Sequence, residues 1–166
     1  MKWMITGLGG TLAPHLARAA ASAGVDVVGW NRTRVDPDDI AGGDRFLAAE
    51  KPDAIAHLGM GSADWAGRLA AEAQARGIPF VFTSTATVFD SVPDGPHAID
   101  AERNTKDPYG QYKIACESAV LSAYPDASVA RLQAILVDHL DRQSSASGHA
   151  ATQVARLGVI YRDLAP

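Results

Sequence analysis

The sequence has little of what marks secreted, membrane-spanning or nucleic-acid-binding proteins. Its single cysteine, Cys116, cannot form a disulfide within the chain, which is typical of a reducing compartment. No apolar run reaches the roughly 18 residues of a membrane-spanning helix. The net charge of −4 offers no attraction for nucleic acid or for an anionic membrane. We therefore predict a cytoplasmic protein that binds neither, and we expect no metal site.

What is present indicates one α/β domain. A chain of 166 residues is about the size of one domain, and 47% hydrophobic residues supply a core. Apolar runs typical of buried strands alternate with helical runs, which favours a doubly wound, mostly parallel sheet with helices on both faces. Ser62 can cap a further helix at 63–76, which Gly77 ends. Residues 44–51 have a helical composition, whereas residues 35–43 are a polar connection with only a poor strand candidate. We therefore expect a strand order near 3-2-1-4-5-6 with an abbreviated edge at the third strand.

The chain opens with a glycine turn between a strand and a helix. Trp3-Met4-Ile5 is a strand candidate, Thr6-Gly7-Leu8-Gly9-Gly10-Thr11-Leu12-Ala13 follows, and residues 16–23 are helical. Glycine lets backbone N–H groups approach an anion, and a helix N-terminus adds a partial positive charge. The turn predicts a dinucleotide pyrophosphate site. The alternative is an ordinary strand–helix turn, because one glycine motif is a weak signal.

The end of the second predicted strand, residues 25–30, bears on the choice of dinucleotide. An NAD site usually places an acid about 20 residues past the glycine turn, to bind the ribose 2′-hydroxyl. This chain has Asn31 there, followed by Arg32 and Arg34. A guanidinium can bind a 2′-phosphate, so we predict NADP as the cofactor and NAD as the alternative. The two arginines could instead be solvated loop charges.

Two later segments carry the candidate chemistry. A strand candidate at 78–82 runs into the hydroxyl-rich Thr83-Ser84-Thr85, and Asp107-Pro108-Tyr109 begins a helix that extends to about Tyr124. Tyr109 and Lys113 lie on one helix face, where an ammonium lowers a phenol pKa from about 10. Such a phenol can exchange a proton with a carbonyl oxygen during hydride transfer. Either motif alone is also common in structural roles.

The combination resembles the extended short-chain dehydrogenase/reductase family, whose nucleotide-binding domain has the Rossmann fold. STATVFD and PYGQYKIACE are similar to segments of nucleotide-sugar epimerases and reductases, and FTSTATVFD looks most like the dTDP-4-dehydrorhamnose reductase branch. Ala13 and Tyr112 depart from the usual Gly and Ser or Thr of that family.

The resemblance implies a role for each matching residue, and by it the pyrophosphate would be surrounded by Gly7, Gly10, Thr11 and Leu12. Thr85, with Ser84 as a neighbour, would bind the substrate oxygen, Tyr109 would be the general acid/base, and Lys113 would also hold the nicotinamide ribose. Leu58 and Gly59, in the segment His57-Leu58-Gly59-Met60-Gly61, would pack against the adenosine half of the cofactor. His57 itself is expected to be a buried core histidine.

These observations lead to a function with open alternatives. We expect residues 1–136 to form the NAD(P)-binding domain and residues 137–166 a short tail, with one helix at 150–164, in place of the family's substrate lobe. The predicted function is NADP-dependent oxidoreduction or epimerisation at the keto or hydroxyl group of a nucleotide sugar. The alternatives are a stand-alone dinucleotide-binding domain with little turnover, and a structural partner in a pseudo-dimer. A homodimer is compatible with the sequence.

Overall fold

Strands and helices alternate along the chain, as predicted. The computed structural model describes residues 1–89 and 97–132. The elements are β1 Lys2–Thr6, α1 Ala13–Ser22, β2 Asp26–Gly29, α2 Ile40–Glu50, β3 Ala54–His57, α3 Ala63–Arg76, β4 Phe80–Thr85, the 3₁₀ turn η1 Ala86–Phe89, α4 Pro108–Ala123 and β5 Ser128–Leu132. The end of the predicted final strand at 133–136 and the whole tail at 137–166 lie outside the described residues.

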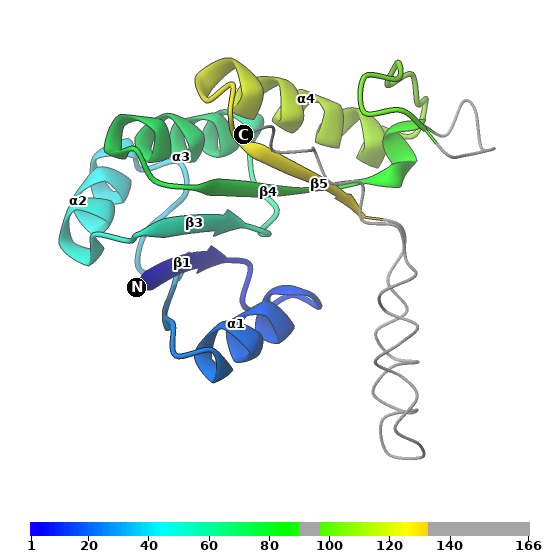
Figure 1. The fold of residues 1–166 in the computed structure, drawn as a ribbon. Coiled ribbons are helices and arrows are strands. Elements are labelled where there is room, and N and C mark those ends of the chain that lie inside the picture. The colour runs from blue at the N-terminus through cyan, green and yellow to red at the C-terminus, as the bar shows by residue number, and fades with distance from the viewer. Residues whose placement is uncertain (90–96, 133–166) are drawn as a thin grey trace, which may run out of the picture. The chain divides into compact units, whose positions relative to one another are not determined.

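The strands form one sheet in the order β2-β1-β3-β4-β5. Strand β1 pairs in parallel with β2 and β3, and β3 pairs in parallel with β4. Helix α1 lies on one face of the sheet, and α2 and α3 lie on the other (Figure 1). This confirms the doubly wound α/β fold. The order is that of the predicted sheet without its third strand, and none of the described residues forms a strand beyond β2.

The chain divides into two compact units, which we describe separately. The first contains Met1–Thr83 and Ala115–Val129, and the second contains the described residues of 84–114 and 130–132. The core of the first unit lies around the middle of the sheet, where Met4, Ile5 and Ile55 are almost completely buried. Strands covered by helices on both faces require such continuous apolar runs.

Helix α2 begins earlier than the sequence predicted. We expected a polar connection up to Gly43 and a helix from Asp44, but the helix starts at Ile40. Asp39 caps it, because its carboxylate accepts the Gly42 N–H at 2.9 Å. Both glycines lie inside the helix, where a Cβ on Gly42 would overlap the Asp39 carboxylate and a Cβ on Gly43 would lie 3.2 Å from Cη2 of Trp30. Gly42 thus makes room for the capping side chain, and Gly43 makes room for the indole ring.

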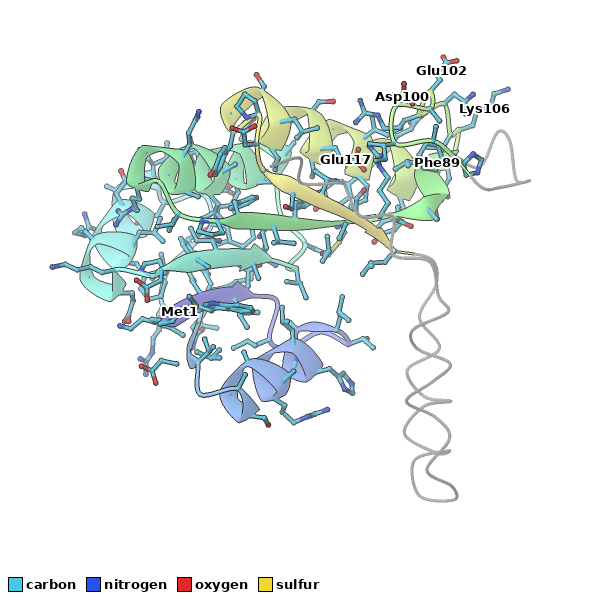
Figure 2. The ribbon with its side chains drawn as sticks, in the orientation of Figure 1. Met1, Phe89, Asp100, Glu102, Lys106 and Glu117 are labelled. Atoms are coloured by element: carbon cyan, nitrogen blue, oxygen red, sulfur yellow. The ribbon has the colours of Figure 1, made fainter. Side chains whose placement is uncertain are left out.

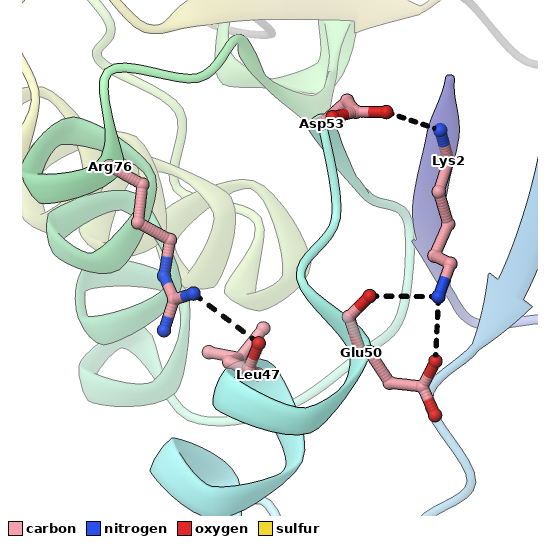
Figure 3. A network of polar contacts seen from close by, with 5 residues as sticks. All are labelled: Lys2, Leu47, Glu50, Asp53 and Arg76. Atoms are coloured by element: carbon pink, nitrogen blue, oxygen red, sulfur yellow. Dashed lines mark hydrogen bonds and ion pairs between the residues drawn. The ribbon is translucent and has the colours of Figure 1, made fainter.

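A polar network joins the amino ends of β1 and β3 (Figure 3). The Lys2 N–H donates to Asp53 Oδ2 at 2.6 Å, and the Lys2 ammonium binds both the carbonyl and the carboxylate of Glu50, at 2.8 and 3.3 Å. Arg76 at the end of α3 donates to the Leu47 carbonyl at 3.3 Å. These contacts fix the end of α2 against the amino ends of β1 and β3, at the opposite end of the strands from the glycine turn.

Replacing Asp39 tests the observed start of α2. We expect Asp39→Ala to lower the free energy of unfolding by about 1 kcal/mol, because the Gly42 N–H loses its acceptor. Asp44→Ala removes an exposed carboxylate inside the same helix and should cause no such loss. Urea unfolding of the two variants measures the difference. Equal stability of both would contradict a helix that starts at Ile40.

Candidate functional site

The glycine turn after β1 lies directly against the chain that follows β3. Gly7 has φ of +80°, a conformation that disfavours side chains. A Cβ on Gly7 would lie 2.8 Å from the Gly59 nitrogen and 2.9 Å from its Cα. Gly10 closes the turn by donating its N–H to the Gly7 carbonyl at 2.8 Å. Only glycine at position 7 allows this approach of the two backbones.

The N-terminus of α1 is suited to an anion. The helix starts at Ala13, three residues before the predicted start, and Leu12 at its N-cap has no side chain that accepts a hydrogen bond. No acidic residue lies in the first turn, while Gly9, Gly10 and Thr11 are exposed and nothing lies within 4 Å of a Cβ built on Gly9. An uncapped helix N-terminus beside exposed glycines is the arrangement that a phosphate group requires.

Leu58 and Gly59 are held to this turn by Thr6. The Thr6 hydroxyl oxygen accepts the N–H of Leu58 at 3.0 Å and the N–H of Gly59 at 2.8 Å. It also lies 2.8 Å from Nδ1 of His57. His57 is 1% exposed, which confirms that it is a core histidine. The sequence analysis assigned no role to Thr6, because its partners are about 50 residues away along the chain.

The loop after β2 presents Arg32 next to an indole ring. The Arg32 guanidinium carbon lies 5.6 Å from the centroid of the Trp65 ring, within the range of a cation–π contact. Asn31 is exposed, and its side-chain oxygen accepts from the Thr33 N–H at 2.9 Å and the Thr33 hydroxyl at 2.7 Å. Asn31 thus shapes the loop that carries Arg32. The Arg34 side chain is exposed.

In the second unit, the end of β4 carries the predicted hydroxyl groups. Ser84 and Thr85 are buried. The Thr85 hydroxyl donates to the Thr87 hydroxyl at 3.0 Å and accepts the Thr87 N–H at 3.2 Å. These two bonds form a small turn that leads from β4 into η1. Thr87 is a contact that the sequence analysis did not predict.

The start of α4 brings the tyrosine and the lysine together. Asp107 caps the helix, as predicted, by accepting the Gly110 N–H at 2.8 Å. The Lys113 ammonium lies 5.8 Å from the Tyr109 ring centroid and 5.7 Å from that of Tyr112. Lys113 is only 3% exposed, whereas Tyr109 is 44% exposed. A buried ammonium beside an accessible phenol is the arrangement expected of an acid/base pair.

Gly110 allows the start of α4 to lie against the turn that follows β4. A Cβ on Gly110 would lie 3.0 Å from the Thr87 carbonyl oxygen, and it would overlap the Thr105 side chain. The residue after Tyr109 therefore rests on the turn that Thr85 begins. The structure thus places Thr85, Tyr109 and Lys113 in one unit, as the predicted site requires.

The segment before α4 is anchored at its beginning and polar at its surface. The imidazole ring of His97 stacks on Phe89 with centroids 4.4 Å apart, and Arg131 lies over the same phenyl ring and donates to the Ile99 carbonyl at 3.0 Å. Asp100, Glu102 and Lys106 are exposed and extend outward from this segment (Figure 2). Its charged groups therefore remain accessible.

Within the described ranges, 1–89 and 97–132, no cluster of three His, Cys, Asp or Glu side chains is placed to hold a metal ion. None of the helices in these ranges is both long and apolar enough to cross a membrane.

Comparison with known proteins establishes the family. Residues 62–146, about half of the chain, match the family model described as RmlD substrate binding domain. The chain belongs to this family. The curated relatives of this RmlD-family chain include dTDP-4-dehydrorhamnose reductases from Mycobacterium tuberculosis, 30% identical over 148 residues, and Mycolicibacterium smegmatis, 33% identical over 145 residues. Both matches cover 77% of the chain, which spans 48% and 44% of the relatives' own lengths.

Solved structures show the same fold. A dTDP-4-dehydrorhamnose reductase from Clostridium acetobutylicum superposes with a TM-score of 0.71 at 21% identity, and covers 87% of this chain and 60% of its own. The reductase from Bacillus anthracis, solved in complex with NADP, has a TM-score of 0.72 at 18% identity, with 88% and 60% covered. The predicted resemblance of this RmlD-family chain to the dTDP-4-dehydrorhamnose reductase branch is confirmed.

Two alanine variants test the close approach of Gly7 to Gly59. Gly7 and Gly24 both have positive φ, but a Cβ would overlap the backbone only at Gly7. We expect Gly24→Ala to cost about 1–2 kcal/mol from backbone strain alone. Gly7→Ala should cost more, because the two turns must also move apart. The difference in free energy of unfolding, measured with urea, isolates the overlap, and equal losses would contradict it.

Proposed function

We propose that this RmlD-family chain is the dinucleotide-binding part of an NADP-dependent oxidoreductase that acts on the keto or hydroxyl group of a nucleotide sugar. The observation that carries the proposal is the buried Lys113 ammonium beside the accessible Tyr109 phenol, in the same unit as Thr85. The curated relatives, which are named dTDP-4-dehydrorhamnose reductase, support the substrate class.

The first unit would hold the cofactor. The backbone at Gly7, Gly10, Thr11 and Leu12 offers N–H groups and a helix N-terminus to the pyrophosphate. Leu58 and Gly59 would lie along the adenosine half. Arg32, steadied over Trp65 in a loop shaped by Asn31, offers the guanidinium that a 2′-phosphate needs, which favours NADP over NAD.

The second unit would move the proton. When bound, the nicotinamide supplies a hydride to the carbonyl carbon of the sugar. The Tyr109 phenol donates its proton to the carbonyl oxygen, and the nearby ammonium of Lys113 stabilises the phenolate that remains. Thr85 would hydrogen-bond the same oxygen, and Ser84 is its alternative. Lys113 would also bind the nicotinamide ribose.

The setting follows from the proposed chemistry. A dTDP-linked 4-keto sugar is the substrate we expect, in the cytoplasm, where NADPH is the common reductant. A homodimer stays a prediction. Cofactor binding with no turnover would instead make the chain a stand-alone dinucleotide-binding domain, and the two experiments below separate these functions.

The first experiment tests the choice of cofactor. We expect the chain to bind NADPH more tightly than NADH in a fluorescence titration. Arg32→Ala should weaken NADPH binding about tenfold or more, because a charge-assisted hydrogen bond to the 2′-phosphate is lost, and should leave NADH binding unchanged. Arg18→Ala, an exposed arginine in α1, is the control. Equal weak binding of both cofactors by the unaltered chain would contradict the role of Arg32.

The second experiment tests the proton donor. With a dTDP-4-keto sugar and NADPH, we expect Tyr109→Phe to lower the rate of NADPH oxidation by about 10²–10⁴-fold. The affinity for NADPH should change little, since the phenyl ring remains. Tyr112→Phe serves as the matched control on the same helix. An unchanged rate in Tyr109→Phe would exclude Tyr109 as the acid.

A further inference from the structure

The Thr6 hydroxyl has three polar neighbours and one proton. Leu58 N, Gly59 N and His57 Nδ1 lie 3.0, 2.8 and 2.8 Å from its oxygen. The two backbone N–H groups can only donate, so they occupy both lone pairs of the oxygen. The single hydroxyl proton therefore points to His57. It follows that Nδ1 of His57 carries no proton and accepts this hydrogen bond.

The His57 ring is held in the orientation that this bond requires. Its centroid lies 4.6 Å from the Trp65 ring in an edge-to-face contact and 5.6 Å from the Phe82 ring in a stacked contact. Thr6 and His57 are 0% and 1% exposed, so water does not compete for the hydroxyl. Aromatic packing thus fixes the orientation of the His57 ring, and the ring fixes the direction of the Thr6 O–H bond.

We infer that His57 is a positioning residue for the cofactor site: it orients the Thr6 hydroxyl, which then fixes the Leu58 and Gly59 backbone against the glycine turn. Without an acceptor at Nδ1, the buried hydroxyl proton would lose its partner, and the hydroxyl would no longer be held with both lone pairs toward the Leu58 and Gly59 N–H groups. The contact between Gly59 and Gly7 would then loosen. This inference rests on the proposed function, because it assigns the purpose of the contact to dinucleotide binding.

The test compares two replacements of His57 in the full chain. His57→Asn places an amide oxygen near the position of Nδ1, whereas His57→Leu fills the space without an acceptor. We expect the Leu58 and Gly59 amide protons to exchange with deuterium about tenfold faster in His57→Leu, and NADPH affinity to fall about tenfold. His57→Asn should restore both values toward those of the unaltered chain.

Thr6 and Thr83 provide a matched control. Both hydroxyls contact His57, but Thr6 faces the Nδ1 atom of the ring, whereas Thr83 donates to the His57 backbone carbonyl at 3.3 Å. Thr6→Val should therefore reproduce the loss seen in His57→Leu, while Thr83→Val should keep normal exchange at Gly59 and normal NADPH affinity.

The nitrogen NMR spectrum of the unaltered chain identifies the protonated nitrogen of His57, and so tests the inference even if His57→Leu fails to fold. It should show His57 protonated at Nε2 only. A proton on Nδ1, or unchanged Gly59 exchange in a folded Thr6→Val, overturns the inference. If the spectrum and the exchange rates agree with it while NADPH does not bind to the unaltered chain, the hydrogen-bond arrangement stands and the cofactor role and the proposed function fail together.

Discussion

The backbone contact between Gly7 and Gly59 is the constraint on which the first unit depends. Two turns, one after β1 and one after β3, come so close that a Cβ on Gly7 would overlap the Gly59 backbone. The Thr6 hydroxyl joins them at the carboxyl ends of the strands, where ligands bind in open α/β sheets. At the opposite ends, the Lys2 and Asp53 backbone and side-chain contacts hold the same two strands. The turn that we propose to bind phosphate is thus built on a pair of strands fixed at both ends.

The second unit has to bury a positive charge, and it too depends on a close contact made at a glycine. An ammonium must be buried near a phenol without losing its charge, which is costly unless polar or aromatic groups surround it. Here two phenol rings flank Lys113. Gly110 allows the first turn of α4 to rest on the chain after β4, so the proposed acid/base pair and the Thr85 hydroxyl lie in the same unit. Tyr112, which departs from the family's usual small residue, takes part in this enclosure.

Local signals in the sequence predicted much of this, and long-range contacts account for the rest. Ser62 and Gly77 gave the bounds of α3, and Asp107 with Pro108 gave the start of α4, because caps depend on a few adjacent residues. The predicted start of α2 was wrong because two adjacent glycines, Gly42 and Gly43, indicate a loop in the sequence. The contact of Gly43 with Trp30, which favours glycine inside the helix, exists only in the folded chain. The pairing of Thr6 with His57 could not be found in the sequence, since it exists only when β1 and β3 are adjacent.

Strand β2 lies at the edge of the sheet, since no other strand in residues 1–89 and 97–132 pairs with its outer side. An edge strand exposes unpaired N–H and C=O groups, which invite the addition of a strand from another chain. In the part of the chain that the structure describes, this edge is only the four residues Asp26–Gly29, with a carboxylate at its start and the exposed Arg32 just beyond its end. An edge that is this short and is bordered by charged side chains offers few unpaired backbone groups to a strand from another chain. Among the described strands, the outermost one is thus a poor template for the addition of a strand from a second molecule.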